Sequence, residues 1–514
     1  MPDILLVAVN AKYIHSSIGQ RSLLANLGDL KFRAKLFEFD IRRHSSEIAE
    51  QILKHHPKIL AFGVYVWNIE LVTEVVRLVK KIEPKICLIL GGPEVSFPQD
   101  HPAVAALADY ILCGESEAIF PQVCHLILSG SAPEAKVILA APPLLDTLEL
   151  PYDLYTEDDI QNRILYIESS RGCPFGCEFC LSSLEKKIRF FNRKKLFLAL
   201  ESLLKRGATQ FKFTDRTFNI NIPYACELLE FFLKRLRPGL FLHFEMVPHL
   251  LPDELKKLLT QFPPASIQLE IGIQTLNSQV AHRISRAHVA QSSTQVQPLD
   301  ANCSVALKEK EILIAEKNIR GIRENTGVHI HADLIAGLPG ENLESFAHGF
   351  DTLLSWNPQE IQLGILKRLR GAPIDRHTEK WGMVYSPLPP YEILKSSHLT
   401  YEELCDLKRF ARFWDLIQNS GRFIQSSPLI WQSQSSAFAA FMECSRWLFK
   451  KLKKQSEIAL PRLARMLEEF LVLVRGLDRD NVHRLIESDL SHSSAKRKKS
   501  LHTSRQDRRI SNQN

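Results

Sequence analysis

Two series of short apolar segments, each segment followed by an amphipathic stretch, constrain the fold of this chain most strongly. Within residues 3–130 the apolar runs lack a two-residue alternation, as expected for parallel strands that are buried on both faces. Residues 69–82, between two of these runs, carry apolar side chains at helical spacing. The alternation predicts a doubly wound, Rossmann-like parallel sheet of five strands over residues 1–135. The expected strands are Ile4–Val9, Lys35–Phe39, Ile59–Val66, Ile86–Leu90 and Tyr110–Cys113.

The second series begins at Ile164, after a proline-rich stretch over residues 136–163 that predicts a linker without regular structure. Six strand–helix units at this spacing predict a partial (β/α)6 TIM-type barrel over residues 164–385, with its site at the carboxyl ends of the strands. Residues 286–311 are rich in Gln, Ser and Ala and show neither period, which predicts a mobile surface insertion. The expected barrel strands are Ile164–Glu168, Gln210–Phe213, Leu240–Glu245, Ser266–Ile273, His329–Ile335 and Glu360–Leu366.

Helical periodicity dominates the rest of the chain. Apolar residues recur every three or four positions in residues 401–419 and 461–477, which predicts a small α-helical domain over residues 391–489. Residues 490–514 form a basic tail without apolar periodicity and are expected to be disordered. The expected fold class is therefore α/β, with a doubly wound sheet, a partial barrel and a helical domain in that order.

The distribution of charge argues against some classes of function. The 514 residues include 65 Lys and Arg and 58 Asp and Glu, a net charge of +7. From Ser491 onward there are seven basic residues and one acidic residue, so nearly all of the excess lies in the tail. A nearly neutral body does not indicate a nucleic-acid interface, and we expect contact with RNA or anionic lipid at most through the tail. Because the chain has no 18-residue apolar run and no basic signal-peptide start, we expect a cytoplasmic protein without a membrane span.

Three cysteines within eight residues carry the clearest chemical signal. They are Cys173, Cys177 and Cys180, in the segment Arg-Gly-Cys-Pro-Phe-Gly-Cys-Glu-Phe-Cys that follows the first barrel strand. Soft thiolates at this spacing select zinc or an iron–sulfur cluster. Structural zinc usually has four ligands, and no fourth Cys or His lies beside the triplet, although zinc and an inert loop both remain open on spacing alone. A 4Fe–4S cluster held by three cysteines would keep one iron open for a ligand.

This cysteine loop, with the aromatic Phe179 directly before its third cysteine, resembles that of the radical S-adenosylmethionine (SAM) enzymes. In that family the open iron chelates the amino and carboxylate groups of SAM, and the reduced cluster cleaves SAM to a 5′-deoxyadenosyl radical. The resemblance implies a 4Fe–4S cluster and SAM as cofactors, with the three cysteines as cluster ligands. Residues 212–219, 269–275 and 331–341 are similar to family strands that approach SAM. The residues thereby implied to bind SAM are Phe179, Asp215, Glu270, Gln274, Gly337 and Leu338.

A doubly wound domain in front of such a barrel resembles the cobalamin-binding class of radical SAM proteins, including a branch with an extra C-terminal helical domain. Cobalamin is implied at the strand ends of the first domain, where the candidate residues are Asn10, Val66, Gly91, Gly92 and Gly114. The family's Asp-x-His-x-x-Gly motif is altered, because Tyr13 stands in the acidic position and Gly19 comes one residue late. We therefore expect no cobalt ligation by His15.

The leading functional hypothesis is an enzyme that cleaves SAM reductively and performs a radical reaction on an unidentified substrate, with cobalamin-assisted methyl transfer as one form of it. Its expected partners are a small-molecule or other substrate and an electron donor such as flavodoxin or ferredoxin. The alternative is an iron–sulfur and corrinoid-binding redox or sensor module without SAM-dependent catalysis. An open iron, together with polar residues on three further strands, favours the enzyme, since an electron carrier needs neither.

Overall fold

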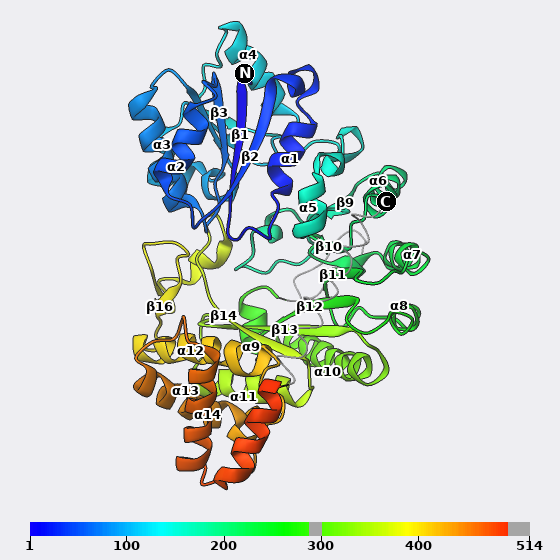
Figure 1. The fold of residues 1–514 in the computed structure, drawn as a ribbon, viewed down its shortest axis with the longest axis vertical. Helices are drawn as coiled ribbons and strands as arrows, with labels where there is room; N and C mark the ends of the chain where they lie inside the picture. Colours follow the sequence, from blue (N-terminus) through cyan, green and yellow to red (C-terminus); the bar gives the residue numbers. More distant parts are fainter. Residues whose placement is uncertain (287–300, 492–514) are drawn as a thin grey trace.

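The structure is a computed structural model that describes residues 1–286 and 301–491, except the side chains of residues 301–304. Figure 1 shows a first sheet domain at one end of the molecule, a second sheet in the middle and the C-terminal helices at the other end. The first sheet is parallel with strand order β2-β1-β3-β4-β5-β6. Its strands are β1 (Ile4–Asn10), β2 (Ala34–Asp40), β3 (Ile59–Gly63), β4 (Cys87–Gly91), β5 (Tyr110–Cys113) and β6 (Val137–Leu139).

Helices cover both faces of this first sheet, which explains its continuous apolar runs. All seven residues of β1 are buried. One apolar cluster joins the sheet to α2 and α3, and another joins its opposite face to α1 and α4. The helices are α1 (Ile18–Ala25), α2 (Ser45–Leu53), α3 (Ile69–Ile82) and α4 (Ile119–Ser129). The predicted doubly wound architecture is therefore confirmed.

Three details of the first domain and the stretch after it differ from the sequence-based prediction. The sheet has six strands instead of five, because β6 comes from the proline-rich stretch that was expected to be a linker. The same stretch contains α5 (Glu157–Asn162), whose N-terminus is closed by a capping box between Thr156 and Asp159. The third strand ends at Gly63 rather than Val66, which lies in the turn before α3.

The second sheet is an open, six-stranded parallel sheet whose strands follow chain order, β7-β10-β11-β12-β13-β14. This arrangement confirms the predicted partial barrel. The strands are β7 (Leu165–Ile167), β10 (Gln210–Phe213), β11 (Phe241–Met246), β12 (Ile267–Gln274), β13 (His329–Ala336) and β14 (Glu360–Ile365). The helices around it are α6 (Arg193–Lys205), α7 (Ile222–Leu233), α8 (Asp253–Leu259), α9 (Ser278–Arg283), α10 (Ala301–Asn325) and α11 (Leu343–Ser355).

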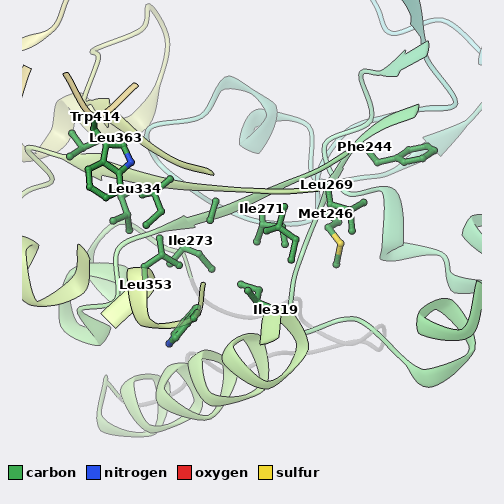
Figure 2. Packing of buried hydrophobic residues seen from close by; sticks show 14 of the residues in the cluster. Phe244, Met246, Leu269, Ile271, Ile273, Ile319, Leu334, Leu353, Leu363 and Trp414 are labelled. Carbon is green, nitrogen blue, oxygen red and sulfur yellow. The ribbon is translucent and has the colours of Figure 1, made fainter. Parts of the chain in front are cut away.

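The alternation of side chains along β12 shows which face of the barrel sheet packs against the surrounding helices and which face points into the barrel. Residues along β12 are alternately buried and half-buried. Figure 2 shows Leu269 and Ile271 on the side of the sheet that packs against Ile319 of α10. The intervening residues, among them Glu270 and Gln274, therefore point to the concave side. The barrel interior is consequently lined by polar side chains.

The expected insertion over residues 286–311 is partly wrong. Residues 301–311 belong to the 25-residue helix α10, which continues to Asn325. Residues 287–300 lie outside the described part of the chain, as does the tail from residue 492 onward. Four consecutive charged residues at 308–311 interrupt the apolar spacing within α10, which is why the sequence pattern missed its start.

The C-terminal region begins with a two-stranded antiparallel hairpin, β15 (Val384–Tyr385) and β16 (Ile393–Lys395). Its helices are α12 (Tyr401–Trp414), α13 (Ala437–Leu452) and α14 (Leu460–Leu473), and a π-helical turn extends α12 to Asn419. The ring of Phe350 on α11 lies 5.1 Å from that of Phe410 and 4.9 Å from that of Trp414. This aromatic packing fixes the helical region to the outside of the barrel.

The segment after β14 folds back onto the first domain. Arg370 Nη1 lies 2.5 Å from Asp100 Oδ1, and the hydroxyl of Tyr391 donates to Glu94 Oε2 at 2.8 Å. A Cβ atom at Gly371 would lie 2.2 Å from the ring of Phe97, so no larger residue fits at this contact. The first domain is therefore held by residues that lie about 270 positions later in the chain.

Candidate functional site

The three cysteines of the loop after β7 lie together at the wall of a cavity inside the barrel. Cys173 and Cys177 are buried, whereas Cys180 is partly exposed. The N–H of Cys173 donates to the carbonyl of Glu185 at 2.8 Å. Phe179, the aromatic residue predicted to lie near SAM, lines the same cavity. The structure thus brings the three predicted ligands and this aromatic ring to one place.

Glu178, between the second and third cysteines, holds the loop in this shape. Its buried carboxylate accepts hydrogen bonds from Ser285 Oγ at 2.5 Å, from His377 Nε2 at 2.7 Å and from Arg376. Its backbone N–H donates to Ile284 at 3.1 Å. A buried carboxylate needs such partners, and here they come from two segments far along the chain. The sequence analysis missed this residue; a carboxylate inside a cysteine loop was the available signal.

The donor set fits a thiolate-bound cluster. Arg286 Nη1 lies 3.2 Å from Cys177 Sγ, and its other terminal nitrogen donates to the carbonyl of Gly272. Burial raises the pKa of the Cys173 thiol, which opposes ionisation, whereas a guanidinium beside the loop favours thiolates. Within the described ranges no three His, Cys, Asp or Glu side chains surround a single metal-ion position. The fit to a cluster therefore rests on three soft sulfur donors, a neighbouring half-buried guanidinium and the shared cavity.

Glu270, on β12, lines the same cavity as the cysteines. Its carboxylate lies 3.0 Å from His243 Nε2 and 3.6 Å from Lys212 Nζ. The hydrogen bond from His243 is the main reason that the pKa of Glu270 falls to about 2. The cavity therefore contains a permanently ionised carboxylate, which suits a ligand with hydroxyl or amino donors.

Two neighbouring side chains present unpaired polar atoms to this region. Gln274 Oε1 and Asp333 Oδ1 are buried and have no hydrogen-bond partner among the described residues. His331 Nε2 is 3.6 Å from Asp333 Oδ1, too far for a hydrogen bond. Burial, with Glu270 nearby, raises the pKa of Asp333 to about 8, so this carboxyl is neutral at lower pH and can donate. Asp333 was not identified from the sequence, although it lies in the glycine-rich segment after residue 331.

The other three residues predicted to bind SAM do not line the cavity. Asp215 lies buried behind the turn after β7 and accepts from Ser169 N at 3.0 Å and from Ser170 Oγ at 2.5 Å. Leu338 is buried, and a Cβ atom at Gly337 would lie 2.6 Å from Ile393. These residues support the shape of the site from outside the cavity.

A second cavity lies between the first domain and the barrel. Gly91, Gly92 and Gly114 line it, as the sequence analysis expected for a corrinoid, whereas Asn10 and Val66 are not among the lining residues. The Asn10 side chain instead donates to Glu38 Oε1 at 3.0 Å. The cavity lies at the carboxyl ends of the strands, near the point between β1 and β3 where the strand order reverses, which is where such sheets bind ligands.

The glycine at position 92 has a structural explanation of its own. Gly92 has φ of +97°, and a Cβ atom there would lie 2.6 Å from the carbonyl oxygen of Val64. An alanine would therefore strain the backbone whether or not a ligand is bound. His15 is hydrogen-bonded through Nδ1 to the hydroxyl of Tyr166 at 2.8 Å and is not among the lining residues. The absence of cobalt ligation by His15 stays a prediction.

Arg171, two residues before the first cysteine, crosses between the domains at the wall of this second cavity. Its guanidinium lies 2.7 Å from Glu115, 2.6 Å from Glu117 and 3.0 Å from Glu168. The first two carboxylates belong to the loop after β5 of the first domain, and the third follows β7. The fork geometry of arginine suits several carboxylates at once. The cysteine loop is thereby tied to the first domain.

Family comparisons agree with this geometry. The family model described as B12 binding domain matches residues 4–124, and that of the Radical SAM superfamily matches residues 167–353. The chain contains a radical SAM domain preceded by a B12-binding domain. These two domains imply a 4Fe–4S cluster, SAM and cobalamin. A third family model, Protein of unknown function (DUF4080), matches residues 379–514 of this radical SAM protein.

Curated relatives are similar at low identity. A cobalamin-dependent radical SAM methyltransferase, TokK from Streptomyces tokunonensis, is 24% identical over 67% of this chain and 52% of its own length. The 2-(S-pantetheinyl)-carbapenam-3-carboxylate methyltransferase of Streptantibioticus cattleyicolor is 24% identical over 62% of this chain and 48% of its own. The anaerobic magnesium-protoporphyrin IX monomethyl ester cyclase of Rubrivivax gelatinosus is 25% identical over 61% of this chain and 57% of its own length. The chain thus spans about half the length of these relatives.

A solved structure supports the fold. The radical SAM methyltransferase TsrM from Kitasatospora setae, solved with cobalamin and a [4Fe-4S] cluster bound, aligns with a TM-score of 0.59 at 14% identity. The alignment covers 88% of this chain and 99% of that one. No helix within residues 1–286 and 301–491 of the radical SAM protein is long and apolar enough to cross a bilayer. The predicted family and fold class are confirmed, while the roles of individual SAM- and cobalamin-binding residues remain predictions.

Proposed function

We propose that this radical SAM protein is a cobalamin-dependent enzyme that cleaves SAM and transfers a methyl group to a small-molecule substrate. The observation that carries the proposal is the proximity of the two cavities. Arg216 lines both of them, and the cysteine loop separates them, with Cys173 on one side and Gly172 on the other. A reaction that uses two cofactors in sequence needs such neighbouring sites.

Residues of the chain have separable tasks in this proposal. Cys173, Cys177 and Cys180 would hold the cluster, whose open iron supplies the site and electron for SAM cleavage, while cobalamin supplies a methyl carrier. Glu270 would accept hydrogen bonds from SAM, because His243 keeps its carboxylate ionised.

The charges on the wall of the barrel cavity bear on the kind of substrate. Arg216 pairs with Glu245 at 3.1 Å, and Lys308 pairs with Glu311 at 3.2 Å, so the cavity wall has charges of both signs. A polar molecule of low net charge suits such a wall better than a polyanion. The names of two of the relatives, which are methyltransferases, support methyl transfer without identifying the substrate here.

The proposed enzyme needs an electron donor and a reducing compartment. Each SAM cleavage consumes one electron, which a low-potential ferredoxin or flavodoxin would deliver. Thiolate ligands and the other described cysteines, all free, favour a reducing environment, and we propose the cytoplasm.

The test is anaerobic reconstitution with iron, sulfide and cobalamin, followed by dithionite and SAM. We expect 5′-deoxyadenosine or methylcobalamin to form with wild-type protein and to disappear in Cys180→Ser, together with the broad visible absorbance of the cluster. Cys226→Ser, on α7 and outside the cavity, is the matched control and should behave like wild type. Iron uptake without any SAM-derived product would favour a redox module and contradict the proposal. Formation of 5′-deoxyadenosine without corrinoid uptake would support SAM cleavage but contradict the proposed role of cobalamin.

A further inference from the structure

A cluster of basic residues follows the cysteine loop directly. Residues 186–195 contain six Lys or Arg and no acidic residue, and they begin six positions after Cys180. The body of the protein is nearly neutral, so the segment is a local excess of positive charge. An uncompensated charge cluster at one place on a surface acts on charged partners.

Backbone contacts place the start of this cluster against the cysteine loop. Glu185 accepts the hydrogen bond from Cys173 N–H at 2.8 Å. A Cβ atom at Gly172 would lie 2.4 Å from the carbonyl oxygen of Lys187, so the two backbones are in contact. In addition, β8 (Ser170–Arg171) pairs with β9 (Arg189–Phe190). The surface formed by residues 184–187 therefore covers the approach to the cysteines.

Three side chains project from this cover into solvent: Leu184, Lys186 and Lys187, which we name the basic edge. Leu184 is 50% exposed. Neither lysine has an ion-pair partner among the described residues, whereas Arg189 and Arg193 further along are paired with Glu115 and Glu227. The basic edge therefore offers unneutralised charge around one exposed apolar side chain. A small apolar centre with a polar rim is the usual composition of a protein interface.

The accessibility of the cysteines also supports an interface at the basic edge. Cys173 and Cys177 are buried, but Cys180 is partly exposed, and residues 181–184 form a 3-10 helix that leads from it to the basic edge. Reductive SAM cleavage at a cluster held by these cysteines consumes an electron, which a donor protein would deliver from outside the chain. The basic edge is a charged surface adjacent to this more exposed side of the loop.

We propose that Leu184, Lys186 and Lys187 form the docking surface for a small acidic electron-carrier protein of the ferredoxin or flavodoxin class. The inference rests on the proposed function and adds the place where the donor binds. One electron leaves the reduced centre of the carrier, which becomes oxidised, and enters the cluster held by the cysteines; no covalent bond forms or breaks in this step. Opposite charges steer the encounter, and the exposed leucine supplies the apolar contact.

Charge reversal at the basic edge tests this surface. In Lys186→Glu/Lys187→Glu we expect formation of 5′-deoxyadenosine driven by a reduced acidic ferredoxin to fall about tenfold or more at low ionic strength. The rate driven by dithionite should not change, since dithionite needs no docking surface. Lys453→Glu/Lys454→Glu is the matched control, because both lysines are exposed at the end of α13 in the C-terminal region. This control should leave both rates unchanged, and Lys186→Gln/Lys187→Gln should give an intermediate ferredoxin-driven rate.

Direct binding of oxidised ferredoxin to the reconstituted protein provides a second measurement. Binding that weakens with added salt and is lost in Lys186→Glu/Lys187→Glu supports the docking surface. Unchanged binding and an unchanged ferredoxin-driven rate in that variant overturn the proposal. An equal fall in the dithionite-driven rate also overturns it, because it would show that the lysines have a structural role. Loss of binding to a short RNA, without any effect on ferredoxin, would assign the edge to nucleic acid and also overturn the proposal. Wild-type protein that binds ferredoxin at this edge but forms no product even with dithionite would contradict the proposed function instead.

Discussion

The side chain of Asn419 completes the edge of the barrel sheet by pairing with the backbone of Ile361. Asn419 Oδ1 accepts from the N–H of Ile361 at 3.2 Å, and Asn419 Nδ2 donates to its carbonyl at 3.0 Å. Ile361 lies on β14, the edge strand, and Asn419 ends the π-helical turn after α12. The amide thus takes the place of a neighbouring strand, one of the ways in which proteins protect exposed sheet edges.

Asn419→Ala should destabilise the protein by about 1–3 kcal/mol, because it leaves two backbone groups of an edge strand without partners. Thermal or urea unfolding measures this loss. Asn325→Ala is a suitable control, since Asn325 makes one exposed hydrogen bond within its own helix. Equal stability of the two variants would show that water replaces the Asn419 amide without loss.

Arg286→Gln should lower the reduction potential of the cluster. Its guanidinium nitrogen lies 3.2 Å from Cys177 Sγ, and a positive charge there stabilises the more negative, reduced state. A redox titration followed by electron paramagnetic resonance measures the shift. Arg283→Gln removes an arginine of α9 that donates to the carbonyl of Pro339 and lies over the ring of Trp381, and it should leave the potential unchanged. An unchanged reduction potential in Arg286→Gln would show that this arginine does not act on the cluster.

Arg171→Lys should reduce corrinoid retention severalfold while leaving iron content unchanged. Lysine keeps the positive charge but cannot contact Glu115, Glu117 and Glu168 together in the same fork. Corrinoid absorbance and iron analysis of the same sample measure the retained corrinoid and the iron content. The control is Arg370→Lys, at the other contact between barrel and first domain. Equal corrinoid loss in both variants would indicate general loosening of the domains rather than a role of Arg171 at the cavity.

The stability of the apoprotein should depend on Asp333. Burial and the charges of Glu270 and Glu245 raise the pKa of Asp333 to about 8, while Arg286 and Lys212 act in the opposite direction. The folded state therefore binds this proton more tightly than the unfolded state, and stability should fall as the pH rises from about 4 to about 8. Thermal midpoints across this range measure the slope. Asp333→Asn should flatten it, whereas Asp153→Asn, which changes an exposed carboxyl, should not. A slope that persists in Asp333→Asn would show that other groups carry it.

The sequence was informative where a pattern depends on local neighbours. The apolar spacing at residues 266–273 predicted strand β12, and the tight spacing of the cysteines predicted the loop, because each pattern is set within a few residues. The candidates Glu270 and Gln274 came from the family resemblance of the same short segment. Whether a side chain reaches the cavity could not be predicted in this way, because it depends on segments far away in the chain. Asp215 lies just after β10, as predicted, but the turn at Ser169 and Ser170 draws it behind the cavity. For the same reason Glu178 could not be assigned, because its partners Ser285 and His377 are more than 100 positions away.

The return of the chain to its first domain sets an order for biosynthesis. Glu94 and Asp100 receive partners from Arg370 and Tyr391, and Arg171 must also be synthesised before the second cavity has its far wall. A ribosome releases the first domain early, and that domain has its own apolar cores and can fold as a unit. Its corrinoid-facing edge nevertheless stays open until the far wall of the second cavity, which includes Glu168, Arg171 and Arg216, has emerged. A large flat cofactor therefore has a period during synthesis in which it can enter from a side that the finished protein closes.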